Sequence, residues 1–106
     1  MNTAVISIAK DFSRYPAGRF VDDGPFPGET FRKKLLVPAL RDRKSVIVKL
    51  DGTPGYGSSF LEEAFGGLVR LEGFNLNDLK AKLSVEHRDQ SIVDEVWGYI
   101  EKAKPE

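Results

Sequence analysis

The chain contains no cysteine, a single histidine and no excess of charge of either sign. The absence of cysteine excludes disulfide bonds, thiolate metal sites and a cysteine nucleophile. The lone histidine, His87, has neither the companion ligands of a metal site nor a visible nucleophile to activate, so we assign it a structural role. Sixteen basic side chains offset sixteen acidic ones, which argues against nucleic acid or an anionic membrane as a partner.

The sequence also lacks a long hydrophobic run. Residues 1–5 have no basic segment and only a short apolar stretch, so we expect neither a signal peptide nor a membrane-spanning helix, and a cytoplasmic location. The chain has 106 residues, of which 41% are hydrophobic. This length predicts one domain, residues 1–106, with a core of modest size.

Apolar patterning predicts strands that alternate with helices. Strands are expected at residues 5–9, 19–21, 45–50 and 83–87, and helices at residues 29–37, 59–72 and 75–82 and from residue 91 onward. Pro38 is expected to end or kink the first helix. Strands alternating with helices indicate an α/β fold, here a sheet of about four strands covered by helices.

The junction Gly57-Ser58-Ser59 joins the best-defined strand to a helix. Ser59 and Glu62 have the spacing of a capping box, so Ser59 is the expected N-cap. Unpaired N–H groups and the helix dipole at such a start can hold an anion, including a phosphate on a serine. The alternative interpretation is that Ser59 only caps the helix. Later in this helix, Gly66 and Gly67 indicate the close approach of another backbone.

Arginine is frequent near the N-terminus. Arg14, Arg19 and Arg32 could line a site for an anion or a partner. The alternative is that ion pairs, such as those of Arg19 or Arg32 with Glu29 or Asp11, fix the long loop 11–28 in place.

No catalytic constellation is visible, so we expect the protein not to be an enzyme. Glu62 and Glu63 are adjacent and are predicted to face different sides of their helix, which makes them a poor pair for acid–base catalysis. Trp97 falls at core spacing and is expected to serve packing. We expect no metal and no cofactor.

Two blocks of the sequence resemble the bacterial STAS-like domain family of unknown function. The blocks comprise Asp11-Phe12-Ser13, Gly18-Arg19, Gly24-Pro25, Gly28-Glu29, Phe31-Arg32 and the run from Gly57 to Leu68. The resemblance implies the fold of STAS domains, which include anti-sigma-factor antagonists and have a mixed sheet with helices. In those domains a serine at a strand-to-helix turn is phosphorylated by a histidine-kinase-like serine kinase. Ser58 and Ser59 occupy the similar place here, although Tyr56-Gly57 stands where an acidic residue precedes that serine.

The leading hypothesis is therefore a non-enzymatic, cytoplasmic regulatory or protein-interaction domain, monomeric or homodimeric. Its partner, a histidine-kinase-like ATPase or serine kinase, would bind Gly55, Tyr56, Gly57, Phe60 and Glu63, with Ser58 or Ser59 as the switch. One alternative is a small-ligand, nucleotide or anion-binding module that uses Arg14, Arg19, Arg32 and the helix start. Another is an accessory protein of a phage or mobile element that acts only through interactions.

Overall fold

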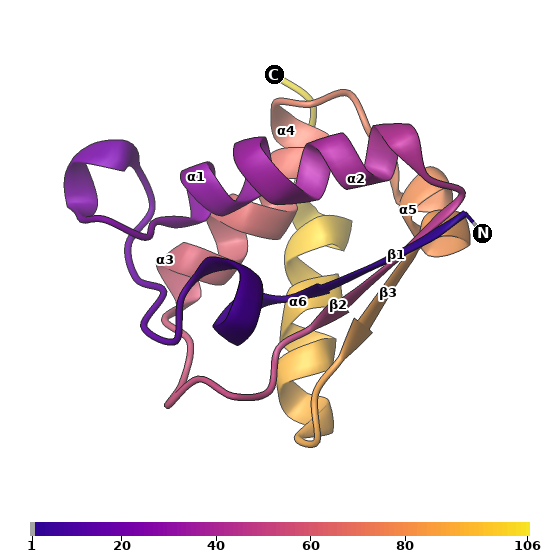
Figure 1. Ribbon diagram of the computed structural model, residues 1–106. Helices are drawn as coiled ribbons and strands as arrows, with labels where there is room; N and C mark the ends of the chain where they lie inside the picture. Colours follow the sequence, from indigo (N-terminus) through magenta and orange to yellow (C-terminus); the bar gives the residue numbers. More distant parts are fainter. Residues whose placement is uncertain (1) are drawn as a thin grey trace.

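The computed structural model describes residues 2–106, which contain a three-stranded parallel sheet. The strands are β1 (Thr3–Ser7), β2 (Ser45–Lys49) and β3 (Leu83–Glu86), in the spatial order β1-β2-β3. The register aligns Val5 with Ile47 and Ile47 with Ser84. In Figure 1 the long helices lie on one side of the strands and α5 lies at one end of the sheet.

Two long helices each contain a π-helical turn at their centre. The first consists of α1 (Gly28–Phe31), η3 (Arg32–Leu36) and α2 (Val37–Asp42), and the second of α3 (Ser58–Leu61), η4 (Glu62–Gly66) and α4 (Gly67–Arg70). The remaining helical segments are the π turn η1 (Ile8–Phe12), the 3₁₀ turn η2 (Val21–Asp23), α5 (Leu76–Lys82) and α6 (Gln90–Lys102). Such π turns are rare and often mark functional sites.

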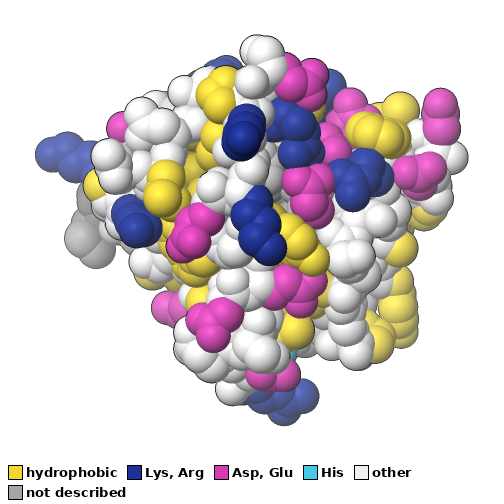
Figure 2. All heavy atoms as spheres, turned by 180° about the vertical axis from the view of Figure 1, so that it is seen from behind, with side chains coloured by type: hydrophobic (Ala, Val, Ile, Leu, Met, Phe, Trp, Pro, Cys, Tyr) yellow, Lys and Arg dark blue, Asp and Glu magenta, His cyan; other side chains and the backbone are white. Residues whose placement is uncertain are grey.

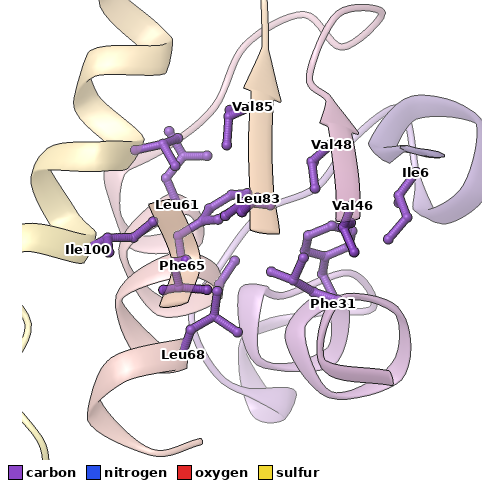
Figure 3. Packing of buried hydrophobic residues seen from close by; sticks show 14 of the residues in the cluster. Ile6, Phe31, Val46, Val48, Leu61, Phe65, Leu68, Leu83, Val85 and Ile100 are labelled. Atoms are coloured by element: carbon purple, nitrogen blue, oxygen red, sulfur yellow. The ribbon is translucent and has the colours of Figure 1, made fainter. Parts of the chain in front are cut away.

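Because successive side chains of a strand point to opposite faces of the sheet, every second side chain packs against the helices. Ile6, Val46, Val48, Leu83 and Val85 are buried, whereas Val5, Lys49 and Glu86 are exposed on the opposite face. Figure 3 shows these inward side chains pointing toward the core residues contributed by the helices, which include Phe31, Leu61, Phe65, Leu68 and Ile100. The sheet is thus covered on one face, and the core lies between that face and the two long helices with α6.

The expected strands at 45–50 and 83–87 and the helix at 75–82 are confirmed, but the strand at 19–21 is wrong. Among residues 2–106 the sheet has three strands, all parallel, and not the mixed sheet of about four. The backbone N–H groups of Arg19 and Phe20 both donate to Asp23 Oδ2, at 3.0 and 2.8 Å, which folds the segment into a turn. Gly18, with φ of 91°, starts this turn, and a Cβ there would lie 2.8 Å from Asp23 Cβ.

Pro38 does not end its helix, which continues to Asp42. The N–H of Val37 donates to the carbonyl of Arg32, five residues back, so the hydrogen-bond register changes just before the proline. Pro38 therefore falls in the first turn of α2, where a missing N–H is tolerated. The expectation that Pro38 ends the helix is therefore wrong, because a π turn in the preceding segment is not visible in the apolar pattern.

The last helix begins one residue earlier than expected. Asp89 is its N-cap, and its carboxylate accepts hydrogen bonds from the N–H and the hydroxyl of Ser91, at 3.0 and 2.7 Å. Trp97 is partly buried against the core, in agreement with its predicted packing role.

None of the described helices combines the length and apolar character that crossing a bilayer requires. Figure 2 shows basic and acidic side chains interspersed on one face of the molecule.

Candidate functional site

Ser58 and Ser59 are the first two residues of α3, and both are exposed. The N-cap is Gly57, in an extended conformation (φ −72°, ψ 149°), and no side chain caps this helix start. The predicted capping box is therefore wrong. The Glu62 carboxylate binds arginines instead of reaching back to the start of the helix. The fold thus leaves both serine hydroxyls unused at a helix N-terminus, where backbone N–H groups are unpaired.

The segment before the serines is held by Tyr56. Its hydroxyl donates a 2.6 Å hydrogen bond to the carbonyl of Leu50, and its ring lies 6.0 Å from the buried ring of Phe60. Burial raises the pKa of Tyr56 above its usual value. Tyr56 therefore anchors the turn between β2 and α3 to the end of the strand.

The five predicted partner-binding residues do not lie on one surface. Gly55 and Gly57 are exposed, and a Cβ at either position would meet no atom within 4 Å. Tyr56 is partly buried, while Phe60 and Glu63 are buried in the interior. The accessible part of this region is thus the turn up to Gly57 together with the two serines.

A network of three arginines and four glutamates lies beside this helix: Glu63 contacts all three arginines, and the exposed Glu106 lies at its edge, 3.9 Å from Arg70 Nε. The Arg32 side chain is fully buried. Its Nη1 donates to Glu63 Oε2 at 2.7 Å and to the Glu63 carbonyl at 2.5 Å, and its Nε donates to Glu72 Oε2 at 2.9 Å. Its Nη2 has no partner among residues 2–106. Gly67 makes room for this guanidinium, since a Cβ there would lie 2.8 Å from Arg32 Cζ.

Arg19 and Arg70 complete the network by binding both Glu62 and Glu63. Arg19 Nη1 contacts Glu62 Oε1 and lies 3.2 Å from Glu63 Oε1. Arg70 Nη1 lies 2.7 Å from Glu62 Oε2, and its Nη2 lies 3.3 Å from Glu63 Oε1. The prediction that Glu62 and Glu63 face different sides is therefore wrong, because both carboxylates contact Arg19 and Arg70. A π turn begins at Glu62, and its wider geometry brings the two successive carboxylates to the same cations.

The pairing shifts the pKa values of three of these groups. Hydrogen bonds with Glu62 raise the pKa of Arg19 and the pKa of Arg70. Partial burial alone would raise the pKa of the Glu62 carboxyl, but the hydrogen bonds from Arg70 and Arg19 outweigh it and the pKa is lowered. All three groups are therefore held in their charged forms at neutral pH.

The three arginines expected to line an anion pocket do not converge. Arg14 is exposed, whereas Arg19 and Arg32 are both paired with Glu63. The arrangement favours the ion-pair interpretation, but the partners differ from Glu29 and Asp11. Glu29 binds Lys33 Nζ at 3.0 Å, and Asp11 accepts the N–H of Ser7 at 2.8 Å.

The glycine prediction also needs correction at Gly67. A backbone does approach Gly66, where a Cβ would lie 3.5 Å from the carbonyl oxygen of Tyr99, but the close neighbour of Gly67 is the Arg32 guanidinium. Backbones approach more closely at Gly28, where a Cβ would lie 2.5 Å from the carbonyl oxygen of Phe60. Gly28 thus sets the crossing of the two long helices, which brings Arg32 against Glu63.

His87 accepts a hydrogen bond from the N–H of Asp89, at 2.9 Å, which supports the turn before α6. Within residues 2–106 there is no ligand-sized pocket and no group of three metal-binding side chains.

A parallel sheet covered by helices, with an exposed serine pair at a helix start, places the chain among α/β domains. The chain belongs to the family described as STAS-like domain of unknown function (DUF4325), whose model matches residues 27–93. The match confirms the resemblance and extends from just before α1 into α6. It does not include β1 or Arg19. Comparisons with curated proteins and with solved structures gave no significant match.

Proposed function

We propose that this STAS-like domain is a non-enzymatic regulatory domain that binds a protein partner and is switched by phosphorylation of Ser58 or Ser59. The observation that carries the proposal is the exposure of both hydroxyls in the first turn of a helix whose cap supplies no side chain. A phosphate there adds about −1.5 to −2 charge. The unpaired N–H groups and the helix dipole favour an anion at this end of the helix.

The geometry supplies a route by which a phosphate would alter the surface. The N–H of Glu62 donates to the Ser58 carbonyl, so the two residues lie one turn apart on the same helix face. A phosphate on Ser58 would repel the Glu62 carboxylate and compete with it for Arg19, whose side chain is 31% exposed. Phosphorylation is thus coupled to the contact between Arg19 and the helix.

Arg19 belongs to the loop that presents most of the exposed large apolar side chains. Tyr15, Phe20 and Val21 are 68%, 50% and 61% exposed, and Arg19 connects their loop to Glu62 and Glu63. Loss of that connection frees the loop, so its affinity for a partner changes with the phosphate. The loop and the helix start together form the proposed regulated surface.

The first experiment tests modification. The purified chain is incubated with ATP and a histidine-kinase-like serine kinase, the class of ATPase proposed as its partner, and the product is examined by intact-protein and peptide mass spectrometry. The expected result is one added phosphate on Ser58 or Ser59, lost in the variant that carries both Ser58→Ala and Ser59→Ala. Ser84→Ala, an exposed serine on β3, is the matched control and keeps the phosphate.

The second experiment tests the switch. Binding to the same ATPase is measured for the native chain, its phosphorylated form and the Ser58→Ala, Ser59→Ala double variant. The proposal requires that phosphate change the affinity and that the double variant resemble the unmodified chain whether or not ATP is present. Binding and regulation that are unaffected by the double substitution would refute the switch.

A further inference from the structure

The outer edge of β1 is an unpaired strand edge. The N–H of Ser45 donates to the carbonyl of Asn2, at 3.0 Å, so the backbone groups of Asn2, Ala4 and Ile6 face β2. By the alternation of a strand, Thr3, Val5 and Ser7 direct their N–H and C=O groups away from the sheet. Of these three N–H groups, that of Ser7 is taken by Asp11 Oδ2. No acceptor for the N–H of Thr3 or Val5 lies within residues 2–106.

Apart from the Asp11 carboxylate at its Ser7 end, the edge of β1 lacks the features that normally prevent strand pairing. Edge strands are usually protected by charged side chains, proline or a bulge. The sequence of β1, Thr3-Ala4-Val5-Ile6-Ser7, contains no charge and no proline. Its central residue, Val5, is 54% exposed on the sheet face that no long helix covers (Figure 1).

The other edge of the sheet differs. β3 has four residues, one of them the charged Glu86, and its Leu83 N–H donates back to Leu79 of α5. Because Leu50 donates to the Glu86 carbonyl, Val85 is the one residue inside β3 whose backbone groups both remain unpaired. β1 is therefore the edge that is suited to accept a further strand.

We propose that the edge of β1 is a self-association surface, on which β1 of a second copy of this chain pairs in an antiparallel orientation. A two-fold axis at Val5 places Val5 opposite the second Val5, Thr3 opposite Ser7, and Ala4 opposite Ile6. This register joins hydroxyl to hydroxyl and a small apolar side chain to a large one, and it brings no charges together. Val5 exchanges two backbone hydrogen bonds with its counterpart, whereas Ser7 contributes none, because its N–H is bound by Asp11 Oδ2 and its C=O begins the π turn η1.

The resulting dimer has one continuous six-stranded sheet. The exposed Val5 side chains pack against each other on its uncovered face, next to Ile47 of each copy, which is paired with Val5 in the register. All-parallel sheets are seldom left open on one face, so an uncovered apolar strip beside a free edge is a reason to expect a partner there. Pairing of two copies gives the unpaired backbone N–H and C=O groups of Val5 hydrogen-bond partners from the same chain type.

The test measures mass in solution and compares substitutions at Val5. Analytical ultracentrifugation of the chain, without a tag at its N-terminus, follows the average mass as the concentration rises. The expected result is a rise from 11.8 kDa toward twice that value. Val5→Pro removes an outward N–H without touching the β1–β2 hydrogen bonds, and Val5→Lys places two cations at the two-fold axis. Both variants remain at 11.8 kDa, while Val21→Lys, at an exposed valine outside the sheet, dimerises like the native chain.

Hydrogen exchange locates the contact in the same samples. The Val5 amide of the native chain becomes more protected as concentration rises, whereas the Ser84 amide, inside the sheet, does not change. Circular dichroism establishes that the variants are folded. If Val5→Pro does not fold, the test rests on Val5→Lys together with the protection of the Val5 amide in the native chain, which a contact through the sheet faces would not produce. A native chain that stays monomeric at all concentrations overturns the proposal. A dimer that survives Val5→Pro but not Val5→Lys also overturns it, because it would form through the open sheet faces and not through the edge.

Discussion

Substitution of Glu63 by glutamine tests whether the arginine–glutamate network stabilises the fold. Glu63 is 2% exposed and its carboxylate contacts Arg19, Arg32 and Arg70 at 3.2, 2.7 and 3.3 Å. Glutamine keeps the size of the side chain and removes the charge. Apart from the exposed Glu106, the network then has three cations against two carboxylates, with Arg32 fully buried.

The expected loss follows from the burial of this pair. Removal of one partner from a buried ion pair costs about 3–5 kcal/mol, because it leaves an uncompensated charge. Glu63→Gln falls near the lower end of this range, because the Arg32 guanidinium loses its ion pair with Glu63 but keeps the one with Glu72. The free energy of unfolding of a domain is only about 5–15 kcal/mol. The variant therefore remains folded but loses a large part of this free energy.

Urea unfolding, followed by circular dichroism and by the fluorescence of the single tryptophan, Trp97, measures this loss. The midpoint falls and the slope stays constant if the denatured state is unchanged. Glu101→Gln, the same change at an exposed position on α6, is the control and should alter stability by less than about 0.5 kcal/mol. A loss for Glu63→Gln as small as that of the control would refute the argument that the buried charge is balanced by Glu63.

A double variant separates charge balance from the loss of individual hydrogen bonds. Arg32→Met combined with Glu63→Gln removes one charge of each sign, so no unbalanced cation is left buried, and Arg19 and Arg70 both keep their contacts with Glu62. Replacing both members of a buried pair is often close to neutral. We therefore expect the double variant to be more stable than the sum of the single losses predicts, by about 0.5–3 kcal/mol. Simple additivity would show that the two residues act independently.

Two further predictions concern the same helices. Gly67→Ala places a Cβ 2.8 Å from Arg32 Cζ and should cost about 1–3 kcal/mol in urea unfolding, whereas Gly98→Ala, with no atom within 4 Å, should stabilise α6 by up to about 1 kcal/mol. Because the folded-state pKa of Glu62 is lowered, its contribution to stability is present above the ordinary value of 4.5 and is lost as pH falls through the folded pKa. The stability difference between the native chain and Glu62→Gln should therefore shrink below about pH 4.5, and a difference that is independent of pH would contradict it.

The elements that the sequence predicts best are those whose pattern is local. The β-branched run of β2 and the apolar positions Val93, Val96 and Ile100 of α6 are buried as expected, because alternation and helical periodicity depend only on nearby residues. The segment 19–21 has strand-like residues but pairs with no strand, because the Asp23 carboxylate folds it into a turn. The local turn thus overrides the strand propensity of these residues.

The ion pairs could not be predicted for a different reason. The sequence suggested acids close to the arginines, such as Glu29, but Arg32 pairs with Glu63 and Glu72, which are 31 and 40 residues away. Which acid meets a buried guanidinium is set by the crossing of the two long helices. The sequence signal for this contact is the pair Gly66-Gly67 inside a helix, where the missing side chain at Gly67 leaves space for Arg32.

The residues that carried the resemblance separate into two groups once their contacts are known. Arg32, Glu63 and Gly67 are accounted for by the buried network, which would be needed in this fold whatever the protein binds. Ser58 and Ser59 lie in the same helix, yet they cap nothing and are exposed. A serine at the cap position now held by Gly57 would stabilise the helix start by only about a few tenths of a kcal/mol, because glycine is itself a good N-cap. The serines stand one and two places beyond that cap, so it is in these two hydroxyls, and not in the network, that a function of this helix should be sought.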